Sequence, residues 1–223
     1  MSLIVLEGLD GSGKSTQVSM LSEYFQQQGN DVFFMHFPQL NTPYFGEMIA
    51  AFLRGDYGEV QQVHPQLVAA LYAGDRWAAA KEIEEHLSLH HIVILDRYVY
   101  SNLAYQCAKL SNESEKEQLR QWILSFEFDF YKIPKPDFNL FLDVPLSFVE
   151  KKLQEHRKGN DRAYLKGKSD IHESNILFQE KVLNEYLYLC KHLSLTYIDC
   201  RLNDTVASPE IVFQRICDAI QTT

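Results

Sequence analysis

The sequence predicts an α/β fold with three layers, in which helices cover both faces of a five-stranded parallel sheet. Five short apolar runs alternate with helical stretches, which is typical of βαβ crossovers. With 223 residues, 46% of them hydrophobic and 23% charged, the chain has the length and composition of one globular domain. We therefore expect a single domain over residues 1–223.

The strand-like runs are Leu3–Leu6, Val32–His36, Ile92–Asp96, Phe138–Asp143 and Leu195–Asp199. Helical stretches lie around residues 15–28, 44–54, 63–87, 99–110, 114–130, 145–156, 173–192 and 209–221. Local chemistry supports several boundaries. Gly29 suits the left-handed residue that ends a helix, and Ser114 with Glu117 fits a capping box. Pro145 and Pro209 suit first helical positions.

A glycine-rich loop follows the first strand and fits the pattern Gly, four free positions, Gly-Lys-Ser/Thr. Its residues are Gly8, Leu9, Asp10, Gly11, Ser12, Gly13, Lys14, Ser15 and Thr16. In such a P-loop, backbone N–H groups surround an anionic phosphate, Lys14 reaches the β- and γ-phosphates, and the Ser15 hydroxyl can ligate Mg²⁺. The following helix points its N-terminus at the anion. The loop predicts a nucleoside triphosphate site and a fold of the P-loop NTPase type.

Charge and cysteine content limit the partners. The net charge of −9 argues against a nucleic-acid polymer or an anionic membrane, because the chain has no excess of cations to displace counterions. Four cysteines without paired or metal-ligand spacing indicate a reducing compartment, so we expect the cytoplasm. We expect neither a signal peptide nor a membrane span, because the first strand begins at about residue 3 and no apolar run is long enough.

The third strand-like run ends in Asp96-Arg97-Tyr98. Strand C-termini line the ligand crevice of a doubly wound sheet, so we expect these side chains to face the P-loop. Arg97 can hold a second phosphate by a bidentate fork, and Asp96 can help to organise Mg²⁺ through water. The alternative is a surface Asp–Arg pair.

A basic, weakly apolar segment covers approximately residues 155–170. Its cations are Arg157, Lys158, Arg162, Lys166 and Lys168. The segment is either a solvated surface loop or, as the P-loop context favours, a mobile lid that closes over the phosphates.

Taken together, these motifs resemble the thymidylate (dTMP) kinase family of P-loop nucleoside monophosphate kinases, over nearly the whole chain and in the family's order. The matching stretches are Glu7–Gln17, Phe37-Pro38, Thr42-Pro43-x-x-Gly46, Leu71-Tyr72-x-x-Asp75-Arg76-Trp77, Asp96-Arg97-Tyr98 with Ser101-Asn102-x-x-Tyr105-Gln106, and Pro134–Asp137 with Phe141–Asp143. The resemblance implies transfer of the γ-phosphate of Mg-ATP to dTMP, which gives dTDP.

The resemblance also implies residue roles. Asp10 would lie between the two nucleotides, and Lys14, Arg97 and a lid arginine, Arg157 or Arg162, would act on the transferred group. The residues implied for the acceptor nucleotide include Phe37 and Pro38. Tyr72 would stack on the pyrimidine, Arg76 would bind its carbonyl, and Arg97 would bind the 5′-phosphate. Asn102 and Gln106, supported by Ser101, would read the edge of the base, and Tyr105 would occupy the space that a ribose 2′-hydroxyl needs. The family further implies a homodimer, for which Trp77 and the alanines 78–80 are candidates.

Two departures keep alternatives open. Leu40 stands where one branch of the family has a phosphate-contacting arginine, and the lid lacks the family's Arg-x-x-Glu ending. A sibling kinase that uses dUMP, dGMP or a nucleoside is therefore one alternative. A non-catalytic nucleotide-binding protein is the other.

Overall fold

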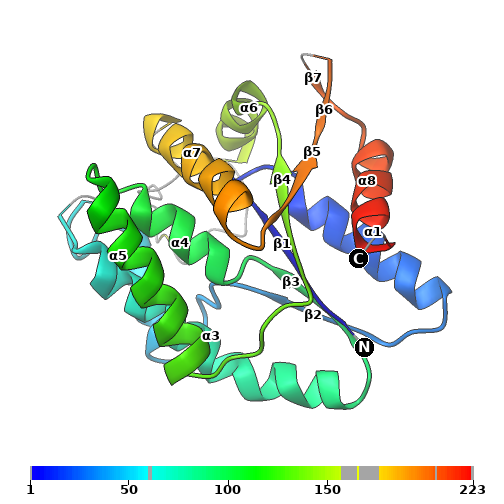
Figure 1. Cartoon of the computed structure of the whole chain (residues 1–223), viewed down its shortest axis with the longest axis horizontal. Coiled ribbons are helices and arrows are strands. Elements are labelled where there is room, and N and C mark those ends of the chain that lie inside the picture. Colours follow the sequence, from blue (N-terminus) through cyan, green and yellow to red (C-terminus); the bar gives the residue numbers. More distant parts are fainter. Residues whose placement is uncertain (1, 60–61, 157–164, 166–175, 204, 222–223) are drawn as a thin grey trace.

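The computed structural model describes residues 2–59, 62–156, 165, 176–203 and 205–221 (Figure 1). At its centre lies a five-stranded sheet in which all neighbouring strands are parallel, in the order β2-β3-β1-β4-β5. The strands are β1 (Ser2–Gly8), β2 (Val32–His36), β3 (Ile92–Asp96), β4 (Phe138–Asp143) and β5 (Thr196–Asp199). All of the predicted strand-like runs are confirmed, with small shifts at their ends.

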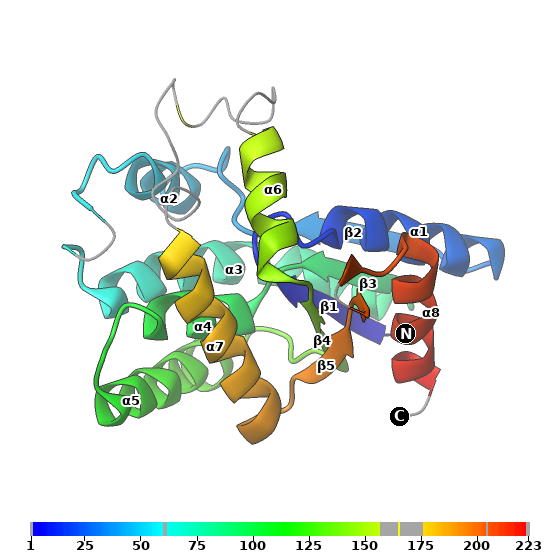
Figure 2. The same ribbon diagram turned by 90° about the horizontal axis from the view of Figure 1, so that it is seen from above.

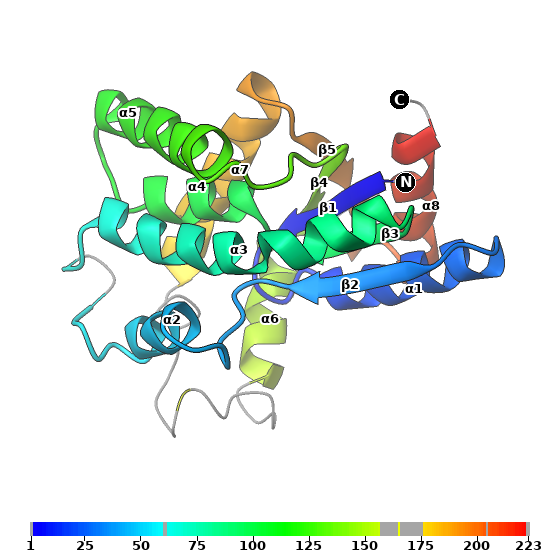
Figure 3. The ribbon, with the colours of Figure 1, turned by 90° about the horizontal axis from the view of Figure 1, so that it is seen from below.

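Helices cover both faces of the sheet, so the predicted three-layer α/β/α fold is confirmed. One face carries α1 (Lys14–Gln27) and α8 (Pro209–Gln221), and the other carries α3 (Pro65–Ser88), α4 (Val99–Cys107), α5 (Glu113–Leu124) and α7 (Ile176–His192) (Figure 2). Helices α2 (Phe45–Leu53) and α6 (Leu146–His156) lie at the edge of the sheet where the strands end (Figure 3). The central strands β1, β3 and β4 are almost wholly buried because both of their faces are covered.

The strand order brings the two predicted phosphate-binding segments together. In the register, Leu6 of β1 pairs with Asp96 of β3, and Gly8 pairs with Leu142 of β4. The P-loop therefore leaves the middle of the sheet beside the segment that follows Asp96. This is the crevice at the strand C-termini where doubly wound sheets bind ligands.

Several element boundaries differ from the predictions. The predicted capping box of Ser114 and Glu117 is wrong: α5 begins at Glu113, and the side chain of Asn112 accepts from the N–H groups of Ser114 and Glu115. Asn112 precedes both and is itself a strong N-cap residue. The predicted helix over 114–130 is two elements, because a π-helix, η1 (Ser125–Phe130), follows α5.

Other local predictions hold or shift by a residue. Gly29 has a φ of 83° after α1, as predicted, and Pro209 opens α8. Pro145 lies one residue before α6, and its carbonyl accepts from the N–H groups of Phe148 and Val149. A short antiparallel hairpin, β6 (Arg201–Leu202) with β7 (Thr205–Val206), was not predicted, because two-residue strands carry no periodicity.

The main hydrophobic core lies between the sheet and its helices. A separate small core of Ile49, Phe52, Leu53 and Val68 joins α2 to α3 beyond the edge of the sheet. Within the described part of the chain, no helix has the length and apolar character needed to cross a membrane.

Candidate active site

The P-loop is shaped as an anion cradle. Gly11 and Gly13 have φ values of 74° and 88°, in the left-handed region that glycine tolerates best. Gly13 is also the N-cap of α1, and no side chain in the described part of the chain caps that helix end. The free N–H groups of the first turn therefore point into the loop, where an anion would receive their hydrogen bonds.

Lys14 lies inside this cradle. Its Nζ donates to the carbonyl oxygens of Leu9 at 2.9 Å and Gly8 at 3.4 Å, and it lies 4.0 Å from Oδ1 of Asp96. Burial, together with the nearby charge of Arg97, lowers the pKa of Lys14 to about 8. A triphosphate in the loop would add negative charge beside this buried ammonium and favour its charged form.

Asp96 closes β3 beside the lysine. Nδ1 of His36 lies 3.2 Å from its Oδ2, whereas its buried Oδ1 has no hydrogen-bond partner among the described residues. Burial by itself would raise the pKa of Asp96. The interactions with Lys14 and His36 have a larger, opposite effect, so the pKa lies below its ordinary value and the carboxylate stays ionised. Ser15 and Asp96 line one shallow depression together. A carboxylate oxygen that accepts no hydrogen bond from the described residues, in the same depression as a hydroxyl, is suited to a hydrated Mg²⁺ held mainly by phosphates and water.

Arg97 has an unusual backbone conformation. Its φ of 68° is uncommon for a residue with a side chain, and such strain is typical of functional sites. The backbone N–H of Arg97 donates to the carbonyl of Leu6 at 2.9 Å, which ties the turn after β3 to β1. This turn directs the side chain toward the P-loop.

The Arg97 guanidinium is held at the boundary between the two predicted subsites. Its Nη2 donates to Oδ1 of Asp10 at 2.6 Å, and its Nη1 donates to Oγ of Ser101 at 3.1 Å. The Tyr105 hydroxyl donates to the other oxygen of Asp10 at 2.8 Å. Burial disfavours the charge, but Tyr105 and Asp10 more than offset it and hold the pKa of Arg97 above its ordinary value. Arg97 is therefore a permanent cation placed to bind a phosphate bidentately.

A carboxylate that sequence reasoning left without a role lies beneath Arg97. Glu7 on β1 is completely buried and accepts from the backbone N–H groups of Tyr98 at 2.9 Å and Ser101 at 3.1 Å. The hydroxyls of Ser101 and Tyr186 also donate to it. Burial raises the pKa of Glu7, although these hydrogen bonds and Arg97 act against the shift. Glu7 thus anchors the N-terminus of α4 and the turn that carries Arg97.

The predicted base-binding residues form a second buried network. Arg76 on α3 donates from Nε and Nη2 to the Glu127 carboxylate at 2.5 and 2.7 Å. Nδ2 of Asn102 donates to the same carboxylate and to the carbonyl of Ala69, each at 3.0 Å. The Oδ1 of Asn102 is buried without a hydrogen-bond partner in the described chain. That oxygen therefore has the capacity to accept a hydrogen bond from a ligand.

The segment after β2 forms the opposite wall. The Phe37–Pro38 peptide bond is cis, and the N–H of Gln39 donates to Oδ2 of Asp75 at 2.9 Å. This bond fixes the turn against α3, the helix that carries Tyr72 and Arg76. Leu40, the departure noted in the sequence, also lines the cavity at this wall.

One cavity of about 1390 Å³ connects these parts. The predicted residues that line it are Asp10, Gly11, Ser12, Gly13, Lys14, Ser15, Thr16, Phe37, Pro38, Tyr72, Arg76, Arg97, Ser101, Asn102, Tyr105 and Gln106. Gly8 and Leu9 do not line it, because they belong to the end of β1 and the core and offer their carbonyls to Lys14 instead. The predicted lid residues Arg157 and Arg162 lie outside the described residues.

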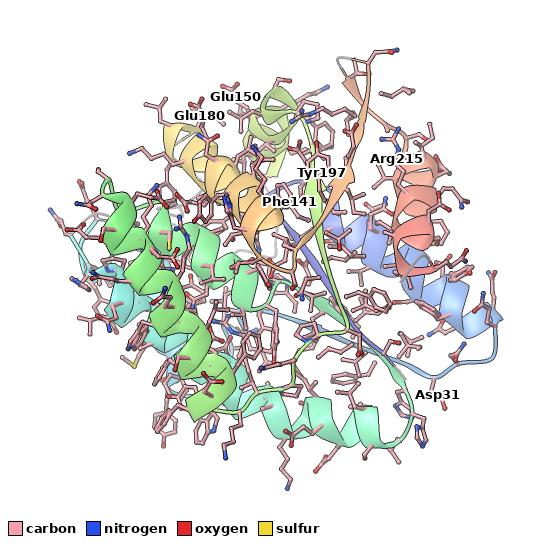
Figure 4. All side chains as sticks on the ribbon, in the orientation of Figure 1. Asp31, Phe141, Glu150, Glu180, Tyr197 and Arg215 are labelled. Atoms are coloured by element: carbon pink, nitrogen blue, oxygen red, sulfur yellow. The ribbon has the colours of Figure 1, made fainter. Side chains whose placement is uncertain are left out.

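Sequence reasoning missed four supporting side chains, Glu7, Glu127, Gln179 and Tyr186. The last two come from α7, where Nε2 of Gln179 donates to Asp10 at 3.2 Å. Tyr186 stacks on Phe141 of β4, with ring centroids 4.6 Å apart, and Figure 4 shows Phe141 at the centre of the molecule. A polar residue within an apolar strand was the one available signal, and it pointed only to Glu7.

Comparisons with known proteins agree with this geometry. The profile of the family described as thymidylate kinase matches residues 6–216. The probable thymidylate kinase of Pyrococcus abyssi is 32% identical over 216 residues, which cover 96% of this chain and 92% of that relative. The thymidylate kinase of Mycobacterium tuberculosis is 36% identical over 142 residues, which cover 64% of this chain and 65% of the relative.

A solved structure shows the same fold. The thymidylate kinase of Candida albicans, described as having a broad substrate specificity, superposes with a TM-score of 0.71 at 29% identity. The match covers 99% of this chain and 91% of the other.

Proposed function

Because the chain belongs to the thymidylate kinase family, we propose that it transfers the γ-phosphate of Mg-ATP to dTMP, giving ADP and dTDP for dTTP synthesis. The observation that carries this proposal is the single cavity that reaches from the P-loop to Arg97 and Asn102. Its volume of about 1390 Å³ exceeds the range of about 300–1,000 Å³ that is usual for one small ligand. Two mononucleotides facing each other through their phosphates would account for that size.

The donor half is the P-loop with its surroundings. The N-terminus of α1 and Lys14 supply positive potential for the β- and γ-phosphates. The cavity continues from there to an apolar wall formed by Phe148, Val206 and Ala207. A purine base of the donor would contact that wall, while Ser15 and Asp96 hold hydrated Mg²⁺. When bound, the metal would neutralise part of the charge on the phosphate oxygens.

The acceptor half is built around Arg97. This guanidinium would bind the 5′-phosphate of dTMP, and Asp10 with Tyr105 would contact the sugar beside it. Tyr72 would stack on the pyrimidine, a contact worth about 1–3 kcal/mol in comparable systems. Oδ1 of Asn102 would accept from the N3–H of thymine, because both of its amide hydrogens are engaged by Ala69 and Glu127.

The chemistry needs little more than positioning. A phosphate oxygen of dTMP is already a competent nucleophile, so the chain does not have to supply a general base. Lys14 and Arg97 neutralise charge on the transferring group from its two sides, and Asp10 keeps the guanidinium in place. We include in the proposal a lid over residues 155–170, whose Arg157 or Arg162 completes the site and excludes water.

A homodimer in the cytoplasm is also part of the proposal. Trp77 and Ala78 are exposed on α3, whereas Ala79 and Ala80 belong to the core, so only part of the predicted alanine face is available. Trp77 stacks on Tyr131 at 5.4 Å between ring centroids, next to Phe130, which is 71% exposed. An exposed aromatic surface of this kind suits a second copy of the chain. The free cysteines support a reducing compartment.

A coupled assay of ADP release tests the proposed reaction. Purified protein is given Mg-ATP with dTMP, dUMP, dGMP, dCMP or thymidine, and dTMP should give the highest kcat/KM. The Lys14→Ala variant should keep its circular dichroism spectrum and thermal transition but lose turnover. Preference for another acceptor would indicate a sibling kinase, and ATP binding without transfer to any acceptor would indicate a non-catalytic protein.

A further inference from the structure

The base-binding end of the cavity carries two side-chain amides on one face of α4. Asn102 and Gln106 are four residues apart, which places them on consecutive turns of the helix, and both line the cavity. The oxygen and nitrogen of an amide are assigned from their hydrogen-bond partners. Which end of each amide faces the cavity therefore depends on the group that holds the other end.

For Asn102 the orientation follows from two acceptors. The carbonyl of Ala69 and the carboxylate of Glu127 can only accept, and each lies 3.0 Å from Nδ2. The nitrogen must face them, so Oδ1 is the end of the amide without a hydrogen-bond partner in the described chain, at a residue that lines the cavity. Asn102 therefore presents an acceptor to the base.

For Gln106 the orientation follows from a lysine. Nζ of Lys109 donates to Oε1 of Gln106 at 2.7 Å, and its N–H groups can donate whether the amine is charged or neutral. The amide oxygen thus faces Lys109, and the donor end of the Gln106 amide is turned away from the lysine. Lys109 does not line the cavity, whereas Gln106 does.

The side-chain amine of Lys109 lies in apolar surroundings. Its Nζ lies 4.7 Å from the centre of the Phe52 ring, in the small core between α2 and α3. A cation over an aromatic face is stabilised by the ring, and burial leaves the ammonium few other acceptors. Burial accordingly lowers the pKa of Lys109 to about 7.

A site that presents the Asn102 acceptor beside the Gln106 donor is complementary to thymine and uracil. All three bases carry the O2 carbonyl, but at positions 3 and 4 thymine and uracil present an N3–H donor next to a carbonyl acceptor, whereas cytosine presents an N3 acceptor next to an amino donor. The donor end of the Gln106 amide would therefore discriminate at position 4. We propose that Lys109 is a positioning residue that fixes the Gln106 amide in the orientation that selects a thymine-type base over cytosine. This inference rests on the proposed function, because it concerns the acceptor of the same reaction.

The test measures kcat/KM for dTMP, dUMP and dCMP in wild type, Lys109→Met and Lys109→Arg. In Lys109→Met the Gln106 amide can rotate, so the dTMP-to-dCMP ratio should fall about tenfold, the effect of one well-placed hydrogen bond. The dTMP-to-dUMP ratio should not change, because both bases share the same edge. Lys109→Arg keeps a donor cation and should restore the wild-type ratio. Lys81→Met, at an exposed position of α3, is the matched control.

A double-mutant cycle separates positioning from a general structural effect. If Lys109 acts through the amide, Lys109→Met should not lower the dTMP-to-dCMP ratio further in a Gln106→Ala background. Should Lys109→Met fail to fold, Lys109→Gln replaces it, since its amide can pair with Gln106 in either orientation. An unchanged ratio in the folded single variants, or an additive cycle, would overturn the inference. Wild-type protein that does not phosphorylate dTMP would instead overturn the proposed function.

Discussion

Arg97 depends on a hydrogen-bonded support that lies behind the cavity wall. Glu7 accepts from the N–H groups of Tyr98 and Ser101, and Asp10 accepts from the guanidinium itself. A left-handed residue persists only where its surroundings hold it, and here both the turn and the side chain are held. The cation that we propose for phosphate binding is therefore placed before any ligand arrives, which reduces the cost of ordering it on binding.

Replacing Arg97 by alanine should impair use of the acceptor specifically. We expect kcat/KM for dTMP to fall about 10²–10³-fold, the usual effect of removing one charge-stabilising donor, with a higher KM and a lower kcat. The KM for ATP should change little. Arg54→Ala is the control, since Arg54 pairs with Asp56 and does not line the cavity. An unchanged dTMP titration would remove Arg97 from the site.

The stability contribution of Lys109 should depend on pH. Its pKa is about 7 in the folded chain, against about 10.4 in an unfolded chain. Between these values the unfolded chain binds more protons, so stability rises with pH, and the cost of the buried charge is largest below pH 7. At pH 6, Lys109→Met should unfold with a free energy about 2–4 kcal/mol higher than wild type, a gap that narrows to a small fraction of this value by pH 10.

Urea denaturation at a series of pH values measures this gap, with Lys81→Met as the control. A difference between Lys109→Met and wild type that stays constant from pH 6 to pH 10 would show that the ammonium is not buried.

At the scale of elements, the P-loop is confined by its neighbours as well as by its own glycines. A Cβ atom on Gly11 would lie 2.8 Å from Cβ of Lys152 on α6, whereas a Cβ on Gly13 would meet no atom of the described residues within 4 Å. Both glycines have positive φ values. Two factors therefore constrain the P-loop: the positive φ values of its glycines, and the close approach of α6 at Gly11.

Alanine substitutions should separate these two effects. Gly13→Ala adds only backbone strain of about 1–2 kcal/mol, whereas Gly11→Ala adds the contact with α6 as well. We expect the KM for ATP to rise about tenfold in Gly13→Ala and considerably more in Gly11→Ala. Equal effects of the two substitutions on ATP binding would contradict the close approach of α6.

The π-helix η1 supports two residues of the proposed base pocket. Its wider turn carries Glu127, which is completely buried and pairs with Arg76 and Asn102. π-turns inserted after α-helices are frequent at functional sites. This element thus supplies the carboxylate that holds one residue on α3 and one on α4, although it lies far from α3 in the sequence.

Removal of this carboxylate should be costly. Glu127→Ala leaves the Arg76 guanidinium buried without its partner, so we expect the free energy of unfolding to fall by about 3–5 kcal/mol. Glu127→Gln keeps the shape of the side chain and should cost less. Thermal and urea unfolding measure both variants. A Glu127→Ala variant as stable as wild type would show that water or another group replaces the carboxylate.

At the scale of the whole molecule, helix α7 from the second half of the chain packs against residues near the N-terminus. Gln179 on α7 contacts Asp10 in the P-loop, and Tyr186 on α7 contacts Glu7 near the end of β1. The site is therefore closed only when the C-terminal half has packed on the sheet.

The aromatic surface around Trp77 should determine the oligomeric state. Light scattering coupled to gel filtration should give the mass of two chains for wild type and of one chain for Trp77→Glu, because a charge in an apolar interface is strongly unfavourable. Leu89→Glu, an exposed position at the end of α3, is the control. A wild-type mass of one chain would contradict the proposed homodimer.

Much of this molecule follows from local sequence alone. The alternation of apolar runs with helices predicted the sheet and its layers, because strand burial and helix periodicity are properties of short segments. The P-loop and Asp96-Arg97 could likewise be placed at strand ends, because parallel strands present their C-termini at one edge. Lys14, Arg97 and Asn102 were therefore identifiable as candidates from their positions along the chain.

Only the tertiary structure decided how those candidates are held. Glu7, Glu127, Lys109 and Gln179 act through contacts with side chains that are in most cases far away in sequence, and no local pattern encodes such a pairing. The orientation of an amide or the burial of an ammonium depends on neighbours that arrive from other elements. The sequence thus determined which functional groups the chain carries at its strand ends, and the packing of α3, α4, η1 and α7 decided which side chains line the cavity.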